Sequence, residues 1–248
     1  LIGQNVMRLL KDDGVAFVGD ITDKKAYEHL PKVDAVIHLA AITDTTFPDD
    51  KEMMRVNYEG FKYVQDYCQE HKLRLVYASS AAIYGCDKKP ITTYALSKRW
   101  CEVYASNYEN AVGLRYFNVY GYSEEHKGKS ASMIYQLYKQ MKAGKRPRLF
   151  KYGDQQRDFI YVKDVAEFTV DALNKGVGVV DVGTGVATSF NEVVEILNKT
   201  MDKNLKPKYI KNPYEFYQDY TCSKNKVGRY SLEEGIRDYE DSIDSDTW

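Results

Sequence analysis

A tyrosine and a lysine stand four residues apart in the segment Tyr94-Ala-Leu-Ser-Lys98. On a helix, side chains four residues apart share a face, so the ammonium of Lys98 can lie beside the phenol of Tyr94. An adjacent positive charge favours the phenolate form, which is the form a general base needs. The pair follows Ser79-Ser80, and the Ser80 hydroxyl could hold a substrate oxygen that gains or loses a proton. This pattern indicates proton transfer, although the same two residues also occur by chance on solvated helix faces.

Short apolar runs alternate with amphipathic helical stretches from residue 1 to about residue 187. Such alternation is typical of βαβ units around a parallel sheet. The apolar spacing predicts helices over 51–71, 93–108, 131–142 and 190–199, and strands over 16–18, 35–38, 74–78, 112–116 and 179–182. We therefore expect an α/β fold, a doubly wound parallel sheet of the Rossmann type, with a smaller C-terminal substrate lobe.

The order of these elements also predicts a domain division. We expect residues 1–121, together with about 155–187, to form a dinucleotide-binding domain, and 122–154 with 188–248 to form the substrate-binding lobe.

Two places in the chain leave too little room for the strands that this fold requires. The first helix begins directly after Leu1-Ile-Gly3, and the predicted strand 16–18 follows that helix at once, which leaves no room for a second strand. We expect that segments of the protein are missing from this chain, among them the first strand and its glycine turn.

Composition excludes several classes of partner. The 248 residues carry 35 Lys+Arg and 36 Asp+Glu without long runs of either sign, whereas a nucleic-acid surface needs clustered basic residues. No apolar run approaches the roughly 20 residues of a membrane helix, so we expect no membrane partner. The four cysteines are widely spaced, with no Cys-x-x-Cys pair, and indicate reduced thiols in a cytoplasmic protein without a metal site.

Several strand ends could face a cofactor. The strand 35–38 runs into Leu39-Ala40-Ala41, where small side chains let the backbone approach a flat ring. Asp20 follows an earlier predicted strand and could bind an adenine amino group, or could simply cap a turn. Asn57 lies on the helix after Ala41, where its amide could brace the active-site strands.

Taken in order, these motifs resemble the extended short-chain dehydrogenase/reductase superfamily, which contains nucleotide-sugar epimerases and dehydratases. Within it, the sequence most resembles the ADP-L-glycero-D-manno-heptose 6-epimerases. The resemblance covers nearly the whole chain. It rests on Leu1-Ile-Gly3, Asp20, His38-Leu-Ala-Ala41, Tyr77-Ala-Ser-Ser-Ala-Ala-Ile-Tyr-Gly85, Tyr94/Lys98, residues 114–121, Arg157-Asp-Phe-Ile-Tyr-Val162 and Asp181-Val-Gly-Thr-Gly185, and for the heptose branch on Thr43-Asp-Thr-Thr46, Glu124-Glu-His-Lys-Gly128, Arg148-Leu-Phe150 and Tyr217-Gln-Asp-Tyr-Thr221.

The resemblance implies inversion of the exocyclic C6 carbinol of a nucleotide-bound heptose. A nicotinamide cofactor, NADP or possibly NAD, removes hydride and returns it to the opposite face after rotation about one carbon–carbon bond. The rotation moves the oxygen, so one acid/base group cannot readily serve both poses. The resemblance implies that Tyr94 serves one pose and Lys127 the other, although a loop lysine is normally only a solvated charge.

The same resemblance implies the binding residues. It places Ser80, Asn118, Gln136, Phe150, Arg157 and Tyr217 at the substrate, although Phe150 could equally be core packing. This family has a serine two residues after its loop lysine, where the chain has Lys129 followed by Ser130, so the hydroxyl contact there stays open. The cofactor would be held by Gly3, Asp20, Ile21, Leu39, Ala40, Ala41, Ile42, Thr43, Asn57, Tyr94, Lys98, Val119 and Lys127.

Two other functions fit the same residues. A UDP-sugar 4-epimerase or another epimerase or dehydratase could use Ser80, Tyr94 and Lys98, but Ala81-Ala82 stands where a dehydratase needs an acidic pair. A dinucleotide-binding sensor would not need a phenol beside an ammonium. The heptose branch implies an ADP-heptose substrate, a homo-oligomer and, by analogy, lipopolysaccharide biosynthesis.

Overall fold

The computed structural model describes residues 1–28, 30–85, 92–213 and 218–244, which divide into two compact units. The N-terminal unit comprises Ile2–Tyr116 and Ala166–Asp181. The C-terminal unit comprises Leu1, Phe117–Val165 and the chain from Val182 onward. Residues 117–121, 155–165 and 182–187, which the sequence grouped with the dinucleotide-binding domain, therefore group with the C-terminal unit.

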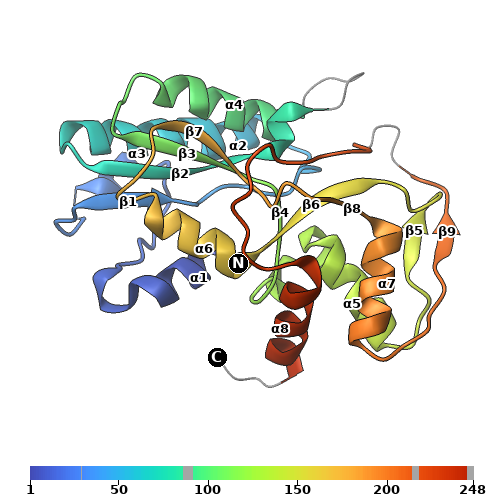
Figure 1. The fold of residues 1–248 in the computed structure, drawn as a ribbon. Helices are drawn as coiled ribbons and strands as arrows, with labels where there is room; N and C mark the ends of the chain where they lie inside the picture. Colours follow the sequence, from blue (N-terminus) through green and yellow to red (C-terminus); the bar gives the residue numbers. More distant parts are fainter. Residues whose placement is uncertain (29, 86–91, 214–217, 245–248) are drawn as a thin grey trace. The chain divides into compact units, whose positions relative to one another are not determined.

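A four-stranded sheet with the order β1-β2-β3-β7 forms the centre of the N-terminal unit (Figure 1). Strand β1 runs parallel to β2, and β2 runs parallel to β3, so the carboxyl ends of these three strands share one edge of the sheet. The four corresponding predicted strands are confirmed, with bounds of Ala35–His38 for β1, Arg74–Ser80 for β2, Ala111–Tyr116 for β3 and Gly178–Val182 for β7.

Helices cover both faces of this sheet. Helices α2 (Asp50–Met54), α3 (Gly60–Glu70) and α4 (Thr93–Ala105) lie on one face (Figure 1). Helices α1 (Ile2–Leu10) and α6 (Val162–Asp171) lie on the other. A parallel sheet covered on both faces is the doubly wound arrangement, so the predicted fold class is confirmed.

The strand predicted over 16–18 is wrong. These residues lie between two 3₁₀ turns, Lys11–Asp13 and Lys24–Tyr27, and in the described chain no strand pairs with them. Val15 and Val18 are 69% and 94% exposed. A β-strand requires a neighbour for its backbone groups, and apolar composition cannot supply one.

The helix predicted over 51–71 contains a π turn, Arg55–Glu59, between α2 and α3. The wider turn rotates the face that meets the core. Met53, Asn57 and Phe61 are each 1% exposed, whereas Met54 and Tyr58 are only partly buried. The π turn thereby directs the amide of Asn57 inward.

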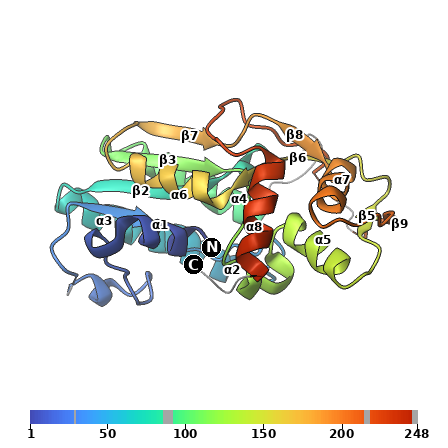
Figure 2. The same ribbon diagram turned by 60° about the horizontal axis from the view of Figure 1, so that its bottom comes forward.

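The described residues of the C-terminal unit form short strands and include the helices α5, α7 and α8. Strand β4 is parallel to β6, β6 is antiparallel to β8, and β5 is parallel to β9. Helix α7 packs against both α5 and α8 (Figure 2). The bounds are β4 Asn118–Tyr120, α5 Met133–Lys142, β5 Arg148–Phe150, β6 Gln156–Tyr161, β8 Ala187–Ser189, α7 Phe190–Thr200, β9 Lys208–Ile210 and α8 Leu232–Asp244.

Helix α8 lies in the acidic end of the chain, for which the sequence analysis gave no helix. Its start is fixed by Ser231, whose backbone N–H and hydroxyl both donate to the carboxylate of Glu234 at 2.8 and 2.6 Å. Ile236 and Tyr239 are each 1% exposed and form its buried face. A serine followed three residues later by glutamate is a helix-start signal that the acidic composition obscured.

Within the described residues, we find no helix of the length and apolar character that a bilayer span requires.

Candidate active site

Lys98 is held in a fixed position beside strand β2. Helix α4 begins at Thr92, whose hydroxyl accepts a hydrogen bond from the N–H of Ala95 at 3.2 Å. One turn later Lys98 is 3% exposed, and its ammonium donates to the carbonyl of Ala78 at 2.9 Å. Tyr94 lies one turn before Lys98 on the same helix and is partly buried. The two residues therefore lie one turn apart on one helix, as the sequence predicts.

Ser80 is the last residue of β2, at the carboxyl edge of the sheet. Its hydroxyl accepts from the N–H of Ala82 at 3.1 Å and caps the 3₁₀ turn Ala81–Tyr84. Side chains alternate along a strand, and the neighbouring Ser79 is buried with its hydroxyl bonded to Glu102. Of the two serines, Ser80 is the one left for a substrate.

The amide of Asn57 braces the loop that follows β1. Its oxygen accepts from the N–H of Ile42 at 2.7 Å, and its nitrogen donates to the carbonyl of Ile42 at 3.0 Å. The same nitrogen lies 3.3 Å from the hydroxyl of Ser97 on α4. Around this brace Leu39, Ala41 and Ile42 are partly buried, and Ala40 and Thr43 are exposed. A small-residue loop held open in this way suits a flat cofactor.

The other predicted cofactor residues of the N-terminal unit have local roles as well. Asp20 is exposed and accepts from the N–H and hydroxyl of Thr22 at 2.8 and 2.7 Å, which lowers the pKa of the carboxyl. This is the turn-capping alternative for Asp20. Ile21 is buried, and its carbonyl accepts from the hydroxyl of Tyr27 at 2.7 Å. A Cβ added to Gly3 in α1 would lie 3.8 Å from Leu39.

An ion-pair network that no sequence motif predicted contacts α4. Glu102 lies one turn after Lys98 and binds Arg115 of β3 through two contacts of 2.8 and 2.7 Å. Arg115 also donates to the hydroxyl of Tyr84 at 2.9 Å, and that hydroxyl donates to Asp181 at 2.6 Å. The network joins α4 to β3, to β7 and to the 3₁₀ turn Ala81–Tyr84. The spacing of Glu102, eight residues after Tyr94 on one helix face, was the available signal.

Lys127 belongs to the C-terminal unit, on the 3₁₀ segment Glu125–Ser130. It is partly buried, and burial lowers the pKa of its ammonium, while the carboxylate of Glu124 raises it. Gly128 follows with φ 54° and ψ −115°, a conformation that glycine adopts without strain. Burial and Glu124 thus act on this pKa in opposite directions, and the catalytic role of Lys127 stays a prediction.

Apart from Ser80, the described residues that were predicted to bind the substrate belong to the C-terminal unit. Asn118 donates to the carbonyl of Asp158 at 3.1 Å, and Gln136 to the carbonyl of Gly128 at 2.6 Å. Arg157 is buried at 7% exposure, donates to the carbonyl of Gln156 at 2.8 Å, and lies over the ring of Phe190. Val119 and Phe150 are partly buried in β4 and β5, and Tyr217 lies outside the described residues.

A buried aspartate orders the strand that carries Arg157. Asp158 is fully buried and accepts from the backbone N–H groups of Thr184, Gly185 and Ser223 at 2.8, 2.9 and 3.0 Å. A Cβ at Gly183 would lie 2.7 Å from this carboxylate. The glycine in Asp181-Val-Gly-Thr-Gly185 is therefore needed for close approach of the backbone to Asp158, which fixes β6 and with it Arg157.

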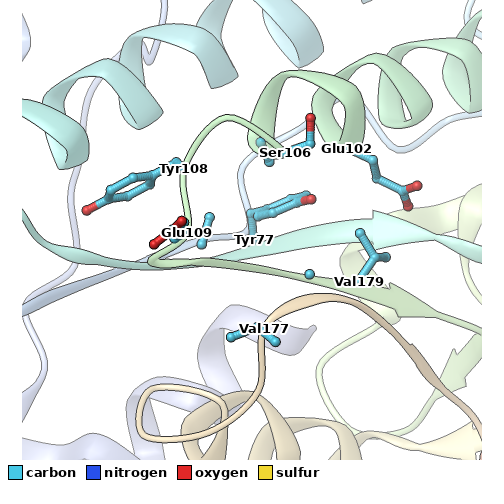
Figure 3. Close-up of a pocket in the computed structure, with 10 residues that line it drawn as sticks. Tyr77, Glu102, Ser106, Tyr108, Glu109, Val177 and Val179 are labelled. Atoms are coloured by element: carbon cyan, nitrogen blue, oxygen red, sulfur yellow. The ribbon is translucent and has the colours of Figure 1, made fainter.

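A pocket of about 340 Å³ lies elsewhere in the N-terminal unit. Figure 3 shows Tyr77, Glu102, Tyr108 and Glu109 around it. Its lining includes the first residues of β3 and β7, at the amino ends of these strands. Ligands of open α/β sheets bind at the carboxyl ends, so this pocket is not the candidate active site.

Buried His38 provides a prediction about stability. It is 6% exposed, and burial, assisted by the charge of Lys98, lowers its pKa to about 3. In the unfolded chain the imidazole of His38 takes up a proton near pH 6.5, whereas in the folded protein it stays neutral until about pH 3. The free energy of unfolding therefore falls by about 1.4 kcal/mol for each pH unit between these two values. We expect His38→Gln to remove about 2–3 kcal/mol of the loss between pH 7 and pH 4.5. Urea unfolding at a series of pH values measures this, and parallel pH curves for the two proteins would contradict it.

Residues 2–183 match the NAD dependent epimerase/dehydratase family. The chain belongs to this family. Its cofactor class, a nicotinamide dinucleotide, is the one for which the family is named, and the predicted resemblance to extended nucleotide-sugar epimerases is confirmed. The donor set of Ser80, Tyr94 and Lys98 at the carboxyl edge of the sheet fits such a cofactor.

Individual relatives of this chain include heptose epimerases and a UDP-glucose 4-epimerase. The chain is 40% identical over 214 residues to an ADP-L-glycero-D-manno-heptose-6-epimerase of Brachyspira hyodysenteriae, which covers 77% of this chain and 67% of the relative. The crystal structure of the Helicobacter pylori ADP-L-glycero-D-manno-heptose-6-epimerase is 35% identical with a TM-score of 0.84, covering 92% of this chain and 78% of that one. A UDP-glucose 4-epimerase of Thermotoga maritima has a TM-score of 0.89 at 21% identity, covering 99% and 96%, and shares the fold alone.

Proposed function

We propose that this protein interconverts ADP-D-glycero-D-manno-heptose and ADP-L-glycero-D-manno-heptose by transient oxidation at C6. The observation that supports the reaction class is the fixed ammonium of Lys98, one helical turn from Tyr94 and hydrogen-bonded to β2 two residues before Ser80. The heptose substrate is supported by the names of the relatives at 40% and 35% identity.

Ser80, Tyr94 and Lys127 are proposed to act at the C6 oxygen, and Lys98 is proposed to act through Tyr94. Ser80 donates a hydrogen bond to this oxygen, and Tyr94 takes its proton in one epimer and returns a proton to the ketone. Lys98 stabilises the phenolate of Tyr94. Lys127 exchanges a proton with the C6 oxygen of the other epimer. Burial lowers the pKa of Lys127, which raises the fraction of neutral amine near pH 7. The nicotinamide, when bound, supplies the hydride acceptor and donor.

The cofactor that we propose is NADP, with NAD as the alternative. Lys98 and the loop Leu39-Ala-Ala-Ile-Thr43, which Asn57 braces, would bind its nicotinamide half, and Val119 and Lys127 would contribute from the C-terminal unit. Asp20 and Ile21 would contact the adenine, and Gly3 would lie near the pyrophosphate. Equilibrium binding of each dinucleotide, followed by quenching of protein fluorescence, distinguishes the two cofactors.

The substrate would be held mainly by the C-terminal unit. The guanidinium of Arg157 can bridge two diphosphate oxygens, which is why we assign it to the ADP moiety. Asn118, Gln136, Phe150 and Tyr217 are proposed for the same ligand. We also propose that the protein works in the cytoplasm and forms a homo-oligomer.

The decisive experiment incubates the protein with NADP and ADP-D-glycero-D-manno-heptose and separates the two C6 epimers by chromatography. We expect both epimers to accumulate to a constant ratio, and no conversion of UDP-glucose to UDP-galactose under the same conditions. Because hydride passes directly through the cofactor, the product carbon should stay undeuterated in heavy water. Conversion of UDP-glucose alone would contradict the proposed substrate, and deuterium at C6 would contradict the proposed chemistry.

A further inference from the structure

We propose that Glu124 is a positioning residue for Lys127: its buried carboxylate closes the base of the loop that presents this lysine. The inference rests on the proposed function for its catalytic consequence. Its structural part concerns the C-terminal unit alone and can be tested separately.

The carboxylate joins the two ends of the loop. Glu124 is fully buried, and one carboxylate oxygen accepts from the N–H of Gly121, which directly follows β4, at 3.1 Å. Ser132, the residue that caps α5, donates its N–H at 2.6 Å and its hydroxyl at 2.9 Å to the same carboxylate. Residues 122–131 are therefore tied at both ends to one side chain.

Lys127 lies inside this closed loop and is connected to its base. The N–H of Lys127 donates to the carbonyl of Glu124 at 3.0 Å. Further along, Gln136 of α5 donates to the carbonyl of Gly128 at 2.6 Å. The backbone on both sides of Lys127 is held by Glu124 and by α5, whose start Glu124 also fixes.

The buried carboxylate of Glu124 carries an energetic cost that its hydrogen-bond donors offset. Removing a carboxylate from water is costly, and a buried one persists only with several donors. Burial raises the pKa of Glu124, and the donors from Ser132 and Gly121 oppose that rise. The negative charge also supports the positive form of Lys127, against the effect of burial. Glu124 thus holds the loop that carries Lys127 and also favours the protonated form of this lysine.

Glu125 provides a matched control. It is the neighbouring glutamate in the sequence and is exposed. Glu124→Gln keeps the shape of the side chain but replaces an acceptor oxygen with an NH₂ donor, which opposes the donors of Gly121 and Ser132. Ser132→Ala removes one of the three donors and serves as a milder variant if Glu124→Gln does not fold.

The first measurement is hydrogen–deuterium exchange of the peptide containing residues 121–132 in the full chain. We expect exchange in Glu124→Gln to be about tenfold faster than in the wild type, because opening the loop then costs roughly 1.4 kcal/mol less. Exchange in Glu125→Gln should equal that of the wild type. Unchanged exchange in both Glu124→Gln and Ser132→Ala would overturn the proposal, whatever the activity.

The second measurement is single-turnover reduction of bound NADP⁺ by each pure epimer, in which the carbinol loses hydride to the cofactor and its hydroxyl proton to the base. We expect Glu124→Gln to slow the reaction of one epimer about 10²-fold, the same epimer that Lys127→Gln affects, and to leave the other within about threefold. Equal slowing of both epimers, or of neither, would overturn the link to Lys127. If the wild type reduces no cofactor with either epimer, the proposed function is wrong, and the exchange result alone decides whether Glu124 closes the loop.

Discussion

Replacing Tyr94 with phenylalanine is expected to lower the rate of epimerisation about 10³-fold while leaving cofactor affinity within about threefold of the wild type. The ring of Tyr94 is partly buried in the first turn of α4, and phenylalanine retains its packing. Lys98 keeps its bond to the carbonyl of Ala78, so the ammonium stays in position. Only the group that exchanges a proton with the substrate oxygen is lost. Initial rates of epimer formation and a fluorescence titration with NADP measure the two effects.

Tyr104→Phe is the matched control for this experiment. Tyr104 lies on the same helix, and its hydroxyl donates to Asp66 at 2.6 Å. Loss of that hydrogen bond should cost about 1 kcal/mol of stability at most and leave turnover unchanged. Wild-type turnover in Tyr94→Phe would remove Tyr94 from the mechanism, and equal losses in both variants would point to damage of α4 instead.

Lys127→Gln is expected to reduce full epimerisation about 10³-fold, with a loss confined to one half of the reaction. If Tyr94 serves one epimer and Lys127 the other, this variant should still reduce bound cofactor with the epimer that Tyr94 serves. Glutamine is one atom shorter than lysine, retains a polar end group and cannot take a proton at neutral pH. Rapid-mixing absorbance at 340 nm with each pure epimer would give the two rates.

The control for this second experiment is Lys129→Gln, which removes an exposed ammonium two residues further along the same loop. We expect both half-reactions of that variant to keep wild-type rates. Equal loss of both half-reactions in Lys127→Gln would contradict the assignment of two separate bases, because a single shared base would then account for the result.

Hydrophobic period was a reliable guide where an element packs on a sheet. Strand β1 has the predicted bounds, and β2, β3 and β7 differ from theirs by one or two residues. Helix α4 likewise begins at the predicted Thr93. In each case one face must be buried, and burial leaves a repeating pattern in the sequence. The proton-transfer pair is visible for the same reason, since Tyr94 and Lys98 share one face of a helix whose period is fixed.

Predictions from the local sequence pattern were wrong where the structure of a segment depends on residues far away in the chain. The apolar segment 16–18 forms no strand because no described strand lies beside it, and the π turn at Arg55–Glu59 changed which residues of the helix are buried. The buried carboxylates are a second example. In the sequence, Glu124 and Asp158 cannot be distinguished from exposed charged residues. Their burial depends on backbone N–H donors, which for Asp158 lie up to 65 residues away in the chain.

The sequence alone determined the fold class, the family and the residues that can exchange a proton, since these depend on residue types and on short, regular spacings. Tertiary structure decided which of those residues are held in place. Lys98 became a fixed ammonium through the carbonyl of Ala78, and Asn57 became a brace through the backbone of Ile42. A hydrogen bond needs two groups within about 3 Å of each other, and for residues far apart in the chain only packing of the complete unit establishes that distance.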